Sequence, residues 1–118
     1  MKLPNGERAI VDIAKLRDYC LNAQHQYGRH KARLFQSVLE FDVNRAEELR
    51  EILLRAALGG EAEAKRQDEH GQRYVIELDL PSRTGHPVRV RSCWIILASE
   101  DVPRLTSCYV VIGKRKKS

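Results

Sequence analysis

The sequence has little of what a disulfide-stapled, secreted or membrane-spanning protein needs. It holds three cysteines, Cys20, Cys93 and Cys108, an odd number without a C-x-x-C pair, so we expect buried, reduced thiols. Its longest apolar run, residues 93–98, is six residues long, against the roughly 20 that a helix needs to cross a bilayer. The opening MKLPNGER lacks the apolar stretch of a secretory signal. We therefore expect a cytoplasmic protein that does not contact a membrane.

Several kinds of site are also missing. Two Phe, one Trp and four Tyr are too few and too mixed in facing to make a base-stacking platform. The glycines match no phosphate-loop pattern, and no G-x-S-x-G stretch indicates an acyl-transfer enzyme. His25 and His30 have a poor spacing for a metal, with no cysteine or carboxylate close by. We expect neither a metal nor a cofactor.

The net charge of +5 hides an uneven distribution. Residues 1–39 carry a charge of +4, residues 40–70 carry −4, and residues 71–118 carry +5. Four of the basic residues in the last segment form the terminal run 114–117, without which the rest of the chain is at +1. Total charge therefore does not argue for a polyanionic partner, and only local clusters can.

The length of 118 residues allows a single domain, which we place at residues 1–113, followed by a basic tail at 114–118. Apolar residues at helical spacing predict three helices. The first begins after an Asp12 cap and ends near Asn22, the second covers residues 29–39, and the third begins at an Asn44 cap and ends at residues 59–60. The polar stretch 59–72 is expected to be a mobile surface connection.

After Gly71 the apolar period changes from 3.6 to 2. This alternation predicts strands over residues 74–80, 88–97 and 104–112, joined by short polar turns. Helices followed by strands indicate an α+β fold, with three N-terminal helices packed on a C-terminal antiparallel sheet of at least three strands.

The start of the second helix, GRHKAR, is the most informative local anomaly. A helix N-terminus carries partial positive charge, so Arg29, His30 and Lys31 are unfavourable there unless an anion is bound. A phosphate at this position would meet free N–H groups, Lys31 and a titratable His30 together. The alternative is that these side chains are simply solvated.

Two further clusters lie on predicted strands. Arg89 and Arg91 share a strand face and could bind phosphate, but Glu77 and Asp79 share a face of the preceding strand and could pair with them instead. Ser107 and Tyr109 also share a strand face, with hydroxyls about 7 Å apart that could donate to a phosphate or be ordinary strand residues.

These blocks carry a resemblance. The segments LPNGERAIVD, KLRDYCLN, HQ-x-GRHKAR-x-F, GQRYV, VRSCWI and DVPRLTSCYV resemble a small bacterial family classed as a domain of unknown function, over residues 3–111. The resemblance implies the toxin side of a toxin–antitoxin or contact-toxin locus, encoded beside a small partner protein. The layout is also similar to the barnase–EndoU–colicin–RelE group of metal-independent ribonucleases. The positions that fall in the matching blocks are His25, His30, Lys31, Arg91, Ser107 and Tyr109.

The leading hypothesis from the sequence is a toxin-type, metal-independent endoribonuclease, in which the 2′-hydroxyl of RNA attacks the adjacent phosphate. His25 or His30 would act as acid or base, Lys31 and Arg91 would neutralise the developing charge, and Ser107 and Tyr109 would position the phosphate. Arg29 and Arg89 would add phosphate contacts. RNA and a small antitoxin-like protein are the expected partners.

The alternative is a non-catalytic protein-interaction domain, the neutralising partner or scaffold of such a locus. Its acidic third helix, with Glu47, Glu48 and Glu51, could meet a basic partner. Plain nucleic-acid binding is a third possibility, and it should weaken steeply with salt.

Overall fold

The first helical segment begins where the sequence predicts it. In a computed structural model that describes residues 1–26 and 28–111, α1 (Ile13–Lys15) runs directly into the π-helical turn η2 (Leu16–Cys20). The carboxylate of Asp12 accepts a hydrogen bond of 3.0 Å from the backbone N–H of Ala14 and so caps the helix. A short 3₁₀ turn, η1 (Gly6–Arg8), precedes it.

The other two helices are also confirmed, with one correction at a cap. The second is α2 (Arg29–Leu34) continued by the π-helical η3 (Phe35–Leu39), and the third is the 3₁₀ turn η4 (Val43–Arg45) followed by α3 (Ala46–Gly59). Asp42, rather than Asn44, supplies the cap, because its side chain accepts from the backbone N–H of Asn44 at 2.9 Å. The extra 3₁₀ turn moves the cap two residues toward the N-terminus, from position 44 to position 42.

The expectation of a mobile connection over residues 59–72 was wrong. This stretch contains β1 (Ala62–Asp68), which pairs antiparallel with the start of β2 (Gly71–Pro81). Of its residues only Ala62 is buried, so the strand has almost no apolar alternation for a sequence pattern to detect. Backbone pairing with β2 holds it, and the Asp68 carboxylate supports the tight turn by accepting from the N–H of His70 at 3.0 Å.

The sheet is a four-stranded antiparallel meander. Its order is β1-β2-β3-β4, where β3 spans Pro87–Leu97 and β4 spans Pro103–Val110. The outer edge of β4 is partly covered by the N-terminal segment, since Ile10 donates to the carbonyl of Pro103 and accepts from the N–H of Leu105. The predicted last strand extended to residue 112, which lies outside the described residues, as does the basic tail.

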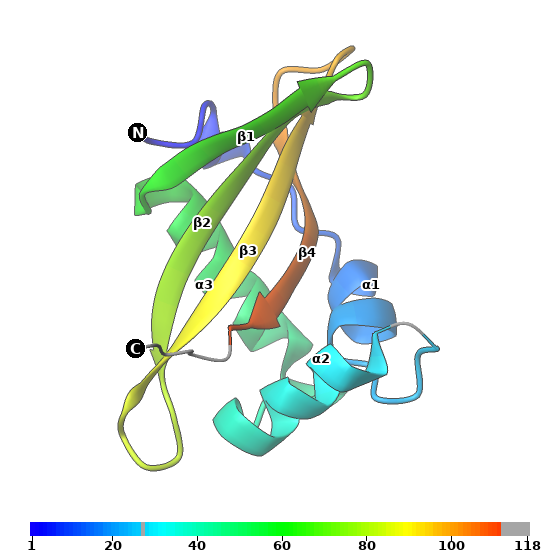
Figure 1. Cartoon of the computed structure of the whole chain (residues 1–118), viewed down its shortest axis with the longest axis vertical. Helices are drawn as coiled ribbons and strands as arrows, with labels where there is room; N and C mark the ends of the chain where they lie inside the picture. Colours follow the sequence, from blue (N-terminus) through cyan, green and yellow to red (C-terminus); the bar gives the residue numbers. More distant parts are fainter. Residues whose placement is uncertain (27, 112–118) are drawn as a thin grey trace.

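The helices cover one face of this sheet, and the core lies between the two layers. Figure 1 shows α3 behind the sheet, with α1 and α2 beside β4. The largest fully buried side chains are Trp94, Phe35, Leu16, Leu49, Leu53 and Ile76. The α+β class is therefore confirmed, and no helix among residues 1–26 and 28–111 covers the opposite face of the sheet (Figure 1).

Candidate functional site

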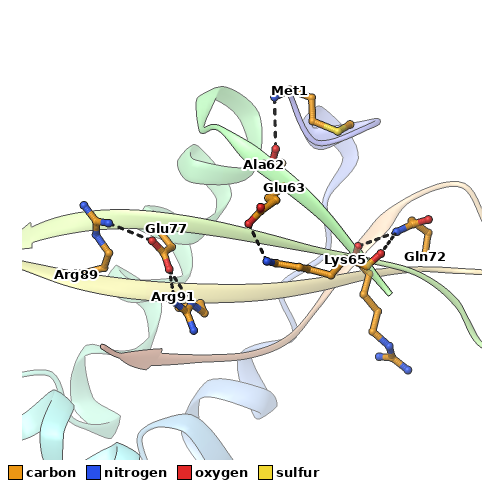
Figure 2. A network of polar contacts seen from close by, with 9 residues as sticks. Met1, Ala62, Glu63, Lys65, Gln72, Glu77, Arg89 and Arg91 are labelled. Carbon is orange, nitrogen blue, oxygen red and sulfur yellow. Dashed lines mark hydrogen bonds and ion pairs between the residues drawn. The ribbon is translucent and has the colours of Figure 1, made fainter. Parts of the chain in front are cut away.

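The uncovered face of the sheet carries a network of ion pairs across β2 and β3. Arg91 donates through Nε to a Glu77 carboxylate oxygen at 2.8 Å, and its Nη2 lies within 2.5 Å of the same oxygen. Arg89 bridges two carboxylates, with Nη1 3.1 Å from Glu77 and Nε 3.2 Å from Asp79. Figure 2 shows Glu77 between the two arginines. The cross-strand pairing that the sequence offered as one alternative is therefore present.

This pairing changes the acidity of the groups involved. The hydrogen bond from Arg91 is the largest cause that lowers the pKa of Glu77, and Arg89 adds to it. In return, Glu77 raises the pKa of Arg91, to which Tyr109 also contributes. Both arginines thus have their charge matched by carboxylates of the same chain, which leaves them little uncompensated charge for a phosphate.

Tyr109 brings the sheet and α2 together. Its position on β4 lies directly opposite Arg91 on β3. The ammonium of Lys31 lies 4.3 Å from the centre of the Tyr109 ring, and the guanidinium carbon of Arg91 lies 6.0 Å from it. Of the predicted site residues, the structure therefore groups Lys31, Arg91 and Tyr109. Ser107 shares this neighbourhood, since it pairs with Cys93 two positions further along the same two strands, on the same face of the sheet.

His25 lies in the loop that leads into α2. Its Nδ1 accepts a hydrogen bond of 3.0 Å from the backbone N–H of Gly28, and its ring packs edge-to-face on Tyr19 with centroids 4.8 Å apart. The backbone N–H of Arg29 also donates to the His25 carbonyl, at 3.1 Å. His25 therefore accepts hydrogen bonds from the backbone N–H groups of Gly28, at the cap position of α2, and of Arg29, its first residue.

The start of α2 lacks a Ser, Thr, Asp or Asn cap, as the sequence predicts, and Gly28 occupies the cap position. His30 and Arg29 are exposed in its first turn. Two of the N–H groups that were expected to meet a phosphate are engaged with His25, so this short helix is completed by its own preceding loop. The proposed phosphate contacts of Arg29, His30 and Lys31 remain predictions.

A shallow hollow of about 670 Å³ lies over the uncovered sheet face, beneath β1. Three carboxylates line it, together with two cations, and each belongs to an ion pair: Glu61 with the N-terminal amine, Glu63 with Lys65 at 2.8 Å, and Glu77 with Arg91. Figure 2 shows the Glu63–Lys65 pair beside the Glu77 network. Its floor includes Val75, Cys93 and Tyr109.

The sequence did not indicate the β1 contribution to this hollow. Glu61, Glu63 and Lys65 belong to the stretch that was expected to be a loop. The signal in the sequence was the short turn from Asp68 to Gly71. This turn indicates a hairpin only if a strand is assumed on each side of it.

Within residues 1–26 and 28–111, no group of three or more His, Cys, Asp or Glu side chains is arranged to hold a metal ion. In the same part of the chain, no helix is both long enough and apolar enough to cross a membrane.

Fold and site define a small α+β domain whose helices cover one face of an antiparallel meander and whose other face is polar and ion-paired. The chain belongs to the family described as domain of unknown function (DUF6883), which matches residues 2–112.

Among solved structures, the chain is similar to one chain of a contact-dependent growth inhibition toxin–immunity protein complex from Klebsiella pneumoniae 342. The match has a TM-score of 0.62 and 15% sequence identity, and covers 92% of this chain and 98% of that one. At that identity the likeness establishes the fold. Comparison with curated proteins found no match.

Proposed function

We propose that this chain is a non-catalytic protein-interaction domain, the neutralising partner or scaffold of a toxin–antitoxin-like pair. One observation carries the proposal: the cations of the uncovered sheet face are already neutralised by carboxylates of the same chain. A phosphodiester placed in the hollow would meet Glu61, Glu63 and Glu77. A protein surface can match such a mixed pattern of charges, whereas the uniform negative charge of RNA cannot.

The remaining observations support the same reading. Of the two histidines expected as acid or base, His25 is engaged in the loop before α2 by its Gly28 contact. The ring of Tyr109 lies under Lys31 and is not open for a base to stack on that side. The similar structure from Klebsiella is a complex of two proteins, which supports a protein partner here as well.

The experiment mixes the purified chain with the purified product of the neighbouring gene and, separately, with total RNA in the presence of EDTA. We expect a stable protein complex by calorimetry, intact RNA with and without that partner, and no growth arrest when the chain is expressed alone. Cleavage of RNA by the isolated chain would overturn the proposal.

A metal-independent endoribonuclease of toxin type is the second candidate, and the grouping of Lys31, Tyr109 and Arg91 favours it. The 2′-hydroxyl would attack the adjacent phosphorus and the 5′-oxygen would leave, giving a 2′,3′-cyclic phosphate. Lys31 would stabilise the negative charge that develops on the phosphate, and the exposed His30 is the histidine available for proton transfer. Cleavage in EDTA that is lost in His30→Ala and Arg91→Ala would establish it.

A further inference from the structure

The basic side chains of the molecule fall into two groups that differ in their surroundings. Of the Lys and Arg side chains in residues 1–26 and 28–111, ten make ion pairs with carboxylates: Arg8, Arg45, Arg50, Lys65, Arg66, Arg73, Arg83, Arg89, Arg91 and Arg104. These include every arginine of the sheet. The other group is therefore the one with positive charge to offer a partner.

Most of that second group lies on two neighbouring helical segments. Lys15 and Arg17 come from α1 and η2, and Arg29, Lys31 and Arg33 come from α2. All five are exposed, and none makes an ion pair with a described carboxylate. We call these five residues the basic helical surface.

The basic helical surface meets the uncovered sheet face at Lys31. Figure 1 shows α1 and α2 adjacent to each other beside β4. Lys31 reaches Tyr109 on β4, which joins the helices to the ion-paired sheet.

We infer that the basic helical surface docks an acidic surface of a partner protein; this inference rests on the proposed function and names the chemistry of its partner. Between residues 13 and 34 the sequence carries five Lys or Arg against one carboxylate, Asp18. A concentration of exposed, unpaired charge attracts an oppositely charged protein and accelerates encounter.

A protein fits this surface better than RNA does because of what adjoins it. Beyond Tyr109 the chain presents Glu77, Asp79 and Glu63, so a polyanion that tracks the helices would run into carboxylates on the sheet. A protein partner can place acidic side chains over the helices and a mixed set over the sheet.

The test titrates the purified product of the neighbouring gene into the full chain and into two charge-reversal pairs, Lys15→Glu/Arg17→Glu and Arg29→Glu/Arg33→Glu. The matched control is Lys2→Glu/Arg55→Glu, which makes the same change in net charge with exposed cations at and beside α3. Circular dichroism checks that each variant is folded. We expect the affinity at low salt to fall about tenfold or more in each test pair, through slower association, and by less than about twofold in the control.

Each outcome decides a different point. Binding that is equally strong in the test pairs and the control overturns the docking surface but leaves the protein-interaction function standing. No binding of the neighbouring product by the wild-type chain overturns the function, and the docking surface with it.

A 20-nucleotide single-stranded RNA serves as the second probe. If at 150 mM salt it binds more tightly than the protein and loses that binding in the same pairs, the surface is a nucleic-acid site instead.

Discussion

The two faces of strand β3 each carry a network of polar contacts. The network on one face is buried, and the network on the other face is in contact with solvent. On the covered face, the Ser92 hydroxyl donates to the carbonyl of Ile76 at 2.8 Å and accepts from the indole N–H of Trp94 at 2.9 Å. On the uncovered face, Arg89 and Arg91 pair with carboxylates in contact with solvent. The first network replaces water entirely, because Ser92 is 0% and Trp94 is 1% exposed.

The buried network contributes mainly to the stability of the fold, whereas the exposed ion pairs are the contacts that a binding partner can exchange. A buried donor or acceptor that loses its partner retains the full cost of desolvation, whereas an exposed ion pair can exchange its partner for water. The covered face is therefore fixed by folding, while the ion pairs of the uncovered face can be rearranged or replaced by a binding partner at small cost.

The largest effect is expected from Trp94→Ala. Trp94 is the largest of the fully buried side chains, and its removal leaves a cavity at the centre of the core. Large-to-small changes of this kind lower the free energy of unfolding by about 3–5 kcal/mol. Urea denaturation followed by circular dichroism measures it, with Arg89→Ala on the opposite face of β3 as the control, for which we expect about 1 kcal/mol or less. Similar losses for the two variants would contradict the comparison.

An intermediate effect is expected from Ser92→Ala. The substitution leaves the indole N–H of Trp94 buried without its acceptor, which costs about 1–3 kcal/mol. Combining it with Trp94→Phe tests the mechanism, since the double variant has no indole N–H to leave unsatisfied. The sum of the losses in unfolding free energy of the two single variants should therefore exceed the loss in the double variant. Strict additivity would show that the hydrogen bond between Ser92 and the Trp94 indole contributes nothing to stability.

The sequence predicted those parts of the fold that leave a local mark. The start of the first helix follows from its Asp12 cap and the end of the third from Gly59–Gly60, while the central strands follow from period-2 alternation. β1 leaves no such mark, because it is an edge strand with one buried residue and its pairing partner is fixed by the sheet. Local pattern cannot detect an element that is stabilised by tertiary pairing.

The candidate site was predictable to a similar extent. The shared faces of Glu77, Asp79, Arg89 and Arg91 follow from strand periodicity, and the register of β2 with β3 makes their pairing definite. The contact between Lys31 and Tyr109 joins α2 to β4 across 78 positions of sequence and depends on helix packing. The capping role of His25 depends on a loop conformation, which no periodicity encodes.

The smallest effect is expected from Glu77→Gln, and it should depend on pH. Arg91 and Arg89 hold the pKa of Glu77 below its ordinary value in the folded protein. Its ionised form therefore contributes stability above the pKa of the unfolded chain, and that contribution is lost as the pH falls through the lower folded pKa. Glu77 is about a third exposed, so we expect a loss of up to about 1 kcal/mol at pH 7 that disappears in acid and shrinks in 1 M salt.

Urea denaturation of wild type and Glu77→Gln at pH 7, 5 and 3 measures this dependence. Asp79→Asn is the matched control, since Asp79 pairs with a single cation, Arg89, among the described residues and is half exposed, and its loss should be smaller. A difference for Glu77→Gln that persists unchanged at pH 3 would mean that the side chain stabilises the sheet by packing rather than by charge. The two faces of β3 would then differ less than their burial implies, and the ion pairs of the uncovered face would be part of the fixed fold instead of a surface that a partner can rearrange.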